Sequence, residues 1–116
     1  MTPGGIVVID WRDAIPESGE PNKQRPGIVV GRSDVFHENF GFVMVVPLTG
    51  DAQMRVAGAT VEIPPTDENR CSKLSYALTW NLQTVLKRRV RVTEAHVTEA
   101  QLEELRDQIA RLVERY

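Results

Sequence analysis

The sequence predicts a mainly β domain, a small barrel or strongly curled sheet, with one helix at its C-terminus. Several short runs of β-branched and apolar residues alternate with loops rich in proline, glycine and polar residues, which is typical of an all-β fold. After them, the apolar residues change to a three- and four-residue spacing, which indicates a helix. At 116 residues the chain is long enough for one hydrophobic core and too short for two. We therefore expect a single domain over residues 1–116, with the barrel in about 1–93 and the helix in about 98–116.

Each expected strand is a short apolar segment bounded by turn-forming residues. The first, GIVVIDW at 5–11, is followed by a long polar loop, and the second, PGIVVG, begins at Pro26. GFVMVVPL at 41–48 is apolar without a break, as in a strand buried on both faces, so we expect it to be central. Further strands are expected at ATVEI (59–63), KLSYALT (73–79) and TVLKRRVRV (84–92).

The C-terminal segment has the features of a capped amphipathic helix. Thr98 and Gln101 have the spacing of a capping box, in which the two side chains accept hydrogen bonds from each other's backbone N–H groups. An apolar stripe follows at helical spacing, formed by Leu102, Leu105, Ile109, Leu112 and Val113. We expect this stripe to pack on the barrel.

The charge of the chain is close to balanced but unevenly distributed. A net charge of −2 lacks the basic excess of a dedicated nucleic-acid-binding domain. Acidic residues are concentrated from Glu94 onwards, however, whereas TVLKRRVRV is locally basic. Alternation along a strand would place Lys87, Arg89 and Arg91 on one face. This face is either a basic contact surface or a charged strand that discourages edge pairing.

Several functional classes are disfavoured by what the sequence lacks. It has no apolar run near the roughly 20 residues that cross a bilayer, and its N-terminus has no secretory pattern, so we expect a cytoplasmic protein without membrane contact. It has no phosphate-binding glycine loop, no paired histidines at metal-ligand spacing and no nucleophile elbow. We therefore expect neither a metal nor a cofactor, and the single cysteine, Cys71, has no internal disulfide partner.

The stretch NKQRPGIVV, residues 22–30, places Arg25 directly before a proline at the start of a buried strand. Pro26 fixes its own φ and restricts Arg25 to extended conformations, so the backbone holds the guanidinium in place. Thr49 ends VVPLT, and Glu20 lies in the first loop. Because strand ends of a barrel can converge on one mouth, Arg25, Thr49 and Glu20 are candidate site residues. Each alone also fits a structural role, as a surface cation, a turn former and a solvated loop acid.

The order and spacing of four segments resemble those of the MazF/PemK family of bacterial toxins. The segments are GGIVVIDW, the RP before an apolar strand, VVPLT about twenty residues later and LSYALTWNLQTVLKRRV before a terminal helix, and together they cover nearly the whole chain. The resemblance implies a small SH3-like barrel of the MazF/CcdB type that forms a homodimer. It also implies the toxin of a type II toxin–antitoxin system, a metal-independent, sequence-specific endoribonuclease that cleaves single-stranded RNA by 2′-hydroxyl attack and is neutralised by a cognate antitoxin.

The resemblance implies that Arg25 is the principal catalytic residue and Thr49 the second. Attack of a ribose 2′-hydroxyl on the neighbouring phosphorus builds negative charge on the phosphoryl oxygens, and a fixed guanidinium can meet two of them at once. Thr49 can donate a hydrogen bond to the same phosphate. Glu20 matches an acidic position of some family members, where it either accepts the 2′-hydroxyl proton or orients Arg25.

Candidate RNA-binding residues lie on both sides of these positions. Many family members carry an acid and a glutamine where this sequence has Trp80 and Asn81, a departure that bears on the substrate contacts. Asn81 can hydrogen-bond a base edge, and Trp80 either stacks on an unpaired base or belongs to the core. The remaining candidates are Lys23, Gln24, Lys87 and Arg89.

Two other functional classes use the same kind of barrel. Gyrase-poison-type toxins bind a protein and cleave nothing, and SH3-like barrels elsewhere act as non-catalytic binding modules. A gyrase-binding surface has no chemical reason to require both Arg25 and Thr49. The presence of this pair therefore favours the nuclease.

Overall fold

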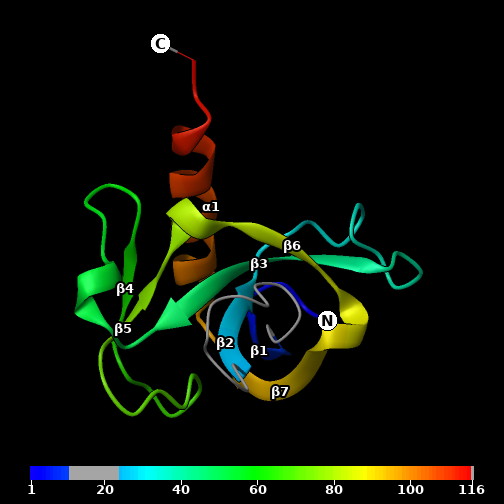
Figure 1. Cartoon of the computed structure of the whole chain (residues 1–116), viewed down its shortest axis with the longest axis horizontal. Coiled ribbons are helices and arrows are strands. Elements are labelled where there is room, and N and C mark those ends of the chain that lie inside the picture. Colours follow the sequence, from blue (N-terminus) through cyan, green and yellow to red (C-terminus); the bar gives the residue numbers. More distant parts are fainter. Residues whose placement is uncertain (11–23, 116) are drawn as a thin grey trace, which may run out of the picture.

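In the computed structural model, which describes residues 1–10 and 24–115, a curled antiparallel sheet is accompanied by one α-helix (Figure 1). The strands are β1 (Gly5–Asp10), β2 (Gln24–Val29), β3 (Phe42–Thr49), β4 (Val61–Ile63), β5 (Ser75–Ala77), β6 (Gln83–Leu86) and β7 (Val90–His96). The helix is α1 (Glu99–Leu112), and short 3-10 helices lie at η1 (Ala52–Met54), η2 (Thr79–Asn81) and η3 (Lys87–Arg89). The predicted mainly β fold with a C-terminal helix is confirmed. None of the helices in the described ranges has the length and apolar character needed to span a bilayer.

β3 is the centre of the sheet, as its unbroken apolar sequence predicts. The strand order is β4-β5-β3-β2-β1-β7, and β6 also pairs with β3. β6 pairs with Phe42–Val45, β2 with Val45–Pro47, and β5 with the last two residues of β3. Figure 1 shows β3 as a long strand that crosses the molecule and ends beside β5. Its C-terminal end is therefore where β2, β3 and β5 come together.

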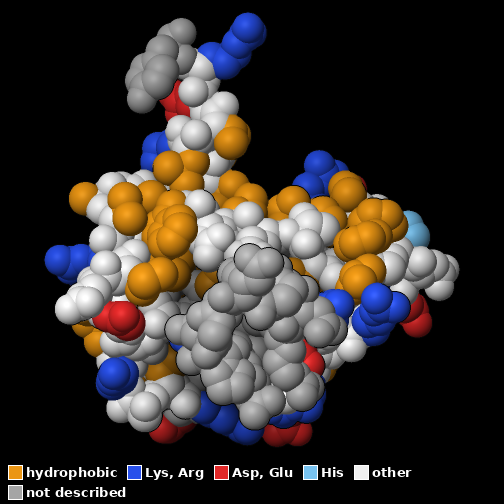
Figure 2. Space-filling view, in the orientation of Figure 1, with side chains coloured by type: hydrophobic (Ala, Val, Ile, Leu, Met, Phe, Trp, Pro, Cys, Tyr) orange, Lys and Arg blue, Asp and Glu red, His pale blue; other side chains and the backbone are white. Residues whose placement is uncertain are grey.

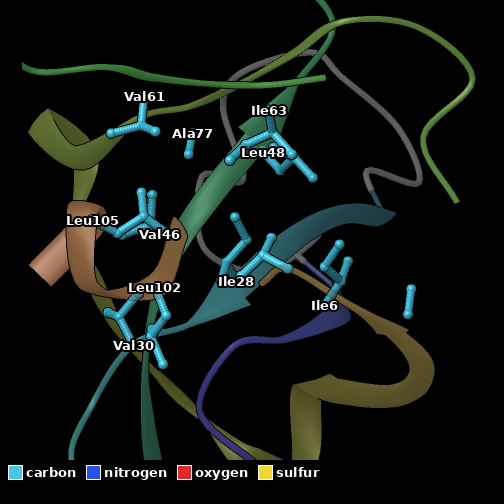
Figure 3. Packing of buried hydrophobic residues seen from close by; sticks show 12 residues of the cluster. Ile6, Ile28, Val30, Val46, Leu48, Val61, Ile63, Ala77, Leu102 and Leu105 are labelled. Atoms are coloured by element: carbon cyan, nitrogen blue, oxygen red, sulfur yellow. The ribbon is translucent and has the colours of Figure 1, made fainter. Parts of the chain in front are cut away.

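Alternate residues of the strands belong to two hydrophobic clusters. In one, Ile28, Val46 and Leu48 pack with Leu102 and Leu105 of α1 (Figure 3). The other cluster contains Val7, Ile9, Val29, Val43, Val45 and Val85. The two-residue period of a strand accounts for this division. It also explains why β3, which contributes to both clusters, has no regular polar alternation.

α1 begins at the predicted cap and ends before the predicted end. The Thr98 side chain accepts a hydrogen bond from the Gln101 N–H at 3.0 Å, and the Gln101 side chain accepts one from the Thr98 N–H at 2.9 Å, which confirms the capping box. The helix ends at Leu112, and the described residues 113–115 do not continue it. Leu112 and Val113 are 44% and 80% exposed, because the last turn projects away from the sheet (Figure 1).

TVLKRRVRV is not one strand. η3 (Lys87–Arg89) separates β6 from β7, because β6 pairs with β3 whereas β7 pairs with β1 at the far end of the strand order. The predicted common face of Lys87, Arg89 and Arg91 is therefore wrong, since alternation along a strand does not pass through a 3-10 turn. β7 also continues to His96, beyond the expected end of the barrel at about 93.

Candidate active site at the end of the barrel

Arg25 and Thr49 face each other across the ends of β2 and β3. The two strands are antiparallel, and Gly27 pairs with Pro47. Continuing this register by two residues puts Arg25 opposite Thr49. On its other side Arg25 pairs with Ile9 of β1, which is fully buried. The Arg25 backbone is thus held within the sheet while the residue itself is exposed.

The Thr49 hydroxyl is oriented by the turn that follows it. Its Oγ1 accepts a hydrogen bond from the Asp51 backbone N–H at 3.1 Å. A hydroxyl has one hydrogen to donate besides its acceptor lone pairs, so this contact leaves the Thr49 O–H available as a donor. The Asp51 carboxylate caps the 3-10 helix η1, where its Oδ1 accepts a hydrogen bond from the Gln53 backbone N–H at 2.9 Å. Thr49 is therefore suited to donate to a bound anion.

A pocket of about 490 Å³ opens beside Thr49. Its walls include residues of β1, β2, β3 and β7 and of the loop before β5. Arg70, Lys73 and Arg91 line it, and no carboxylate is found among the described residues that do so. The positive charge of Arg70 is partly offset by an ion pair of 3.2 Å with Glu94, a residue that does not line the pocket. The pocket is electropositive and suits an anionic ligand.

The loop before β5 is held in shape by Asn69, which is 3% exposed. Its Oδ1 accepts from the backbone N–H groups of Thr66 and Cys71, both at 2.9 Å, and its Nδ2 donates to the Pro64 carbonyl at 2.8 Å. The next residue, Arg70, has a φ of 56°, a left-handed conformation that is unfavourable for a residue with a Cβ. The surrounding bonds keep this conformation in place. The rim of the pocket is thus built by a loop of defined shape.

A smaller pocket of about 170 Å³ adjoins the first, since Arg91 lines both. Gln24 and Arg89, two of the predicted RNA contacts, line it together with Arg88 and Asp10. Figure 2 shows Lys and Arg side chains at the lower edge of the molecule, near β7, together with Asp and Glu side chains. Gln24 and Arg89 therefore lie next to the candidate centre.

Trp80 and Asn81 lie in η2 and line neither of these two pockets. Trp80 is 42% exposed, so it is not a core residue, and its Nε1 donates to the Met54 carbonyl at 3.2 Å. Asn81 Oδ1 accepts from Gln83 Nε2 at 2.9 Å. Their predicted contact with RNA stays a prediction.

Lys87 does not contribute to this surface. Lys87 Nζ donates to the backbone carbonyls of His37 and Glu38, at 2.7 and 3.2 Å, which directs its ammonium to that loop. Lys87 lines neither of the two pockets. Glu20 and Lys23 lie outside the described residues.

Lys73 is one of the pocket residues that were not predicted from the sequence. It follows Thr49 by more than twenty residues, and it reaches the pocket because β5 pairs with the end of β3, Tyr76 opposite Thr49. The only local signal is Gly50, since a glycine directly after a candidate site residue allows another chain segment to approach closely.

Comparison with known proteins gives a family and a fold. The family model described as PemK-like, MazF-like toxin of type II toxin–antitoxin system matches residues 2–113. Among solved structures, an endoribonuclease in complex with its cognate antitoxin from a mycobacterial species gives a TM-score of 0.74 at 19% identity, over 100% of this chain and 98% of that one. MazF from Deinococcus radiodurans gives 0.71 at 20% identity, over 97% of this chain and 96% of that one. No curated protein matches the sequence.

Proposed function

Because this chain belongs to the PemK-like, MazF-like toxins of type II toxin–antitoxin systems, we propose that it is a sequence-specific endoribonuclease that cleaves single-stranded RNA without a metal ion. The proposed step is attack of a ribose 2′-hydroxyl on the adjacent phosphorus. The P–O5′ bond breaks, so the products carry a 2′,3′-cyclic phosphate and a 5′-hydroxyl.

The observation that carries this proposal is the register of β2 and β3, which continues to Arg25 opposite Thr49. A cation and a hydroxyl donor on facing strands can contact one phosphate from two sides. The electropositive pocket beside Thr49 gives the rest of the RNA backbone a place to bind. The arrangement suits a phosphodiester better than a neutral or cationic substrate.

Charge stabilisation is the main task we assign to the pair. As the 2′-oxygen attacks, negative charge develops on the non-bridging oxygens, and the planar guanidinium of Arg25 can bind two of them. Because its backbone is already held in the sheet, little reorganisation is needed during the reaction. The Thr49 O–H adds a second donor. The substrate supplies its own nucleophile, so no metal-bound water is required.

The route of the proton involves a group other than Arg25. A guanidinium with a pKa above about 12 is a poor general base at neutral pH. We propose Glu20 for this part of the reaction, either as the acceptor of the 2′-hydroxyl proton or as the residue that orients Arg25. A Glu20→Gln variant separates these roles, because loss of a base removes the acidic limb of the pH–rate profile whereas loss of an orienting contact does not.

The same family membership supports a proposal for the partners. We propose a cytoplasmic homodimer that is neutralised by a cognate antitoxin, and the mycobacterial endoribonuclease mentioned above was solved with one. An acidic, disordered segment that folds on binding would find complementary charge at Arg25 and in the pocket lined by Lys73 and Arg91. Inhibition would then consist of covering the RNA site.

The test is cleavage of RNA by the purified protein in excess EDTA, with mapping of the new 5′ ends. We expect 5′-hydroxyl ends at a short recurring sequence. Arg25→Ala should reduce the rate on the order of 10² to 10³, the usual cost of one preorganised donor. Arg25→Lys should not restore it, because an ammonium lacks the planar fork. Arg111→Ala, an exposed arginine in the last turn of α1, is the matched control and should cleave normally.

Three results would contradict the proposal: dependence on added metal, cleavage of an RNA with deoxyribose at the mapped site, or full activity of Arg25→Ala. If wild-type protein inhibits gyrase and leaves RNA intact, the gyrase-poison class applies instead. If it does neither, the chain is a non-catalytic binding module.

A further inference from the structure

Lys73 lines the larger pocket, and the proposed cleavage step does not use its charge. We propose that Lys73, together with Arg91, forms a subsite for the RNA phosphate next to the one that is cleaved. The ligand class is a phosphodiester of a single-stranded polynucleotide. This inference rests on the proposed function in taking RNA as the substrate, and its test does not require cleavage.

The Lys73 side chain is held beside Thr49 because position 50 is a glycine. A Cβ built on Gly50 would overlap Cε of Lys73 and lie 3.1 Å from its Nζ, so the lysine stem lies directly on the Gly50 backbone. Ser75 fixes the start of this stem, since its Oγ donates to the Lys73 carbonyl at 3.2 Å. The ammonium therefore sits next to the proposed catalytic threonine.

The Lys73 charge is not neutralised by the part of the chain that the structure describes. No carboxylate there forms an ion pair with it, in contrast to Arg70 on the same rim, which pairs with Glu94. Among the described residues, an ammonium without an ion-pair partner and a hydroxyl donor share one hollow whose lining includes no carboxylate, and together they form an anion site. Arg91 contributes a second cation from the β7 wall.

The order of strands explains why this anion is a neighbouring phosphate rather than the cleaved one. β3 lies between β2 and β5, so Thr49 faces Arg25 on one side and pairs with Tyr76 on the other. Lys73 lies two residues before β5, on that second side. Neighbouring strands are about 4.8 Å apart, so β2, which carries Arg25, and β5, which Lys73 precedes, lie two such steps apart. An RNA strand that crosses this end presents one phosphate to Arg25 and Thr49 and the next to Lys73.

A contact of this kind should contribute affinity and position but little sequence preference. Phosphate contacts orient a nucleic acid and carry no base information. Loss of Lys73 should therefore raise KM for cleavage with a smaller effect on kcat, whereas loss of Arg25 should mainly lower kcat. This difference separates a positioning residue from a catalytic one.

The direct test is binding of a random-sequence pool of 2′-O-methyl RNA, which lacks the attacking hydroxyl, measured by fluorescence anisotropy over a range of salt concentrations. We expect Lys73→Gln to weaken binding roughly tenfold, as for loss of one hydrogen bond to a charged group. The slope of log affinity against log salt should decrease by about 0.7, the value for one contact on a single strand. Arg111→Gln makes the same charge change on α1 and should alter neither quantity.

Gly50→Ala tests the position of Lys73 without removing its charge. The backbone at Gly50 is not left-handed, and the added methyl group would displace only the flexible end of the lysine. We expect this variant to bind the methylated RNA more weakly than wild type and to reduce the salt slope. The double variant Gly50→Ala, Lys73→Gln should be no weaker than Lys73→Gln alone, because both changes remove the same contact.

The subsite is refuted if Lys73→Gln binds the methylated RNA with wild-type affinity and salt slope. It is also refuted if Gly50→Ala and Lys73→Gln lower affinity additively. Independent effects would mean that the Gly50→Ala change does not act through the position of Lys73. Lys73 is exposed, so the unfolding midpoint of the variant should match that of wild type. A wild-type protein that binds the methylated RNA through Lys73 but cuts no unmodified RNA would contradict the proposed function and leave the subsite standing.

Discussion

At the scale of single residues, the hydrogen bond that Thr49 makes within the protein leaves its hydroxyl hydrogen available for a substrate. Thr49 Oγ1 accepts from the Asp51 N–H, so its hydroxyl hydrogen can serve the substrate. Thr49→Val keeps the shape of the side chain and removes this donor. We expect single-turnover cleavage of a mapped RNA to slow on the order of 10²-fold. Thr49→Ser keeps the hydroxyl and should retain most of the activity.

The stability of the Thr49→Val and Thr49→Ser variants provides the control for this comparison. Thr49→Val leaves the Asp51 N–H without its acceptor, but Asp51 is exposed and water can replace the hydroxyl. Both variants should therefore unfold within about 0.5 kcal/mol of wild type. Wild-type cleavage by a folded Thr49→Val protein would show that this hydroxyl is not a catalytic donor.

At the scale of elements, α1 is attached to the sheet by its first turns rather than along its whole length. Leu105 is fully buried, whereas Leu112 is 44% exposed. We expect Leu105→Ala to lower the free energy of unfolding by about 2–5 kcal/mol, through lost burial and a cavity. Leu112→Ala on the same helix should change it by at most about 0.5 kcal/mol. Urea unfolding followed by circular dichroism measures the free energy of unfolding of both variants. Equal losses would mean that the apolar stripe packs on the sheet along its whole length, as the sequence predicts.

A buried polar contact also attaches α1 to the sheet. Gln108 is 8% exposed, its Oε1 accepts a hydrogen bond from the Thr79 hydroxyl, and its Nε2 donates to the Thr60 carbonyl at 3.4 Å. This glutamine does not belong to the apolar stripe, so periodicity alone classes it as a surface residue. It is buried because η2 and the segment before β4 lie against this side of the helix, which also supplies its hydrogen-bond partners.

At the scale of the whole molecule, the chain leaves several large apolar side chains exposed, among them Val35, Phe40 and Phe42. A group of exposed apolar residues on a small domain often marks an association surface. We expect a symmetric homodimer, the commonest closed assembly. Sedimentation equilibrium at tens of micromolar protein should give about twice the chain mass of 13.0 kDa. A single species at the chain mass would contradict this expectation.

Local interactions account for the features that could be predicted from the sequence alone. The capping box depends on Thr98 and Gln101, three residues apart, and the position of Arg25 depends on the proline that follows it. The central place of β3 is visible in its composition, because a strand buried on both faces cannot carry regular polar residues. Arg25 and Thr49 were therefore identifiable as candidates before any fold was known.

Features that depend on partners far apart in the chain could not be predicted in this way and are visible only in the folded protein. TVLKRRVRV has the alternation of one strand, but β6 and β7 pair with different strands, so the chain must turn at η3. The apolar stripe of α1 continues to Val113, but the sheet covers only its first part. Lys73 lies beside Thr49 because β5 pairs with the end of β3 and Gly50 leaves room for its stem. Burial and proximity arise from pairing between segments far apart in the chain, and short-range sequence patterns do not encode that pairing.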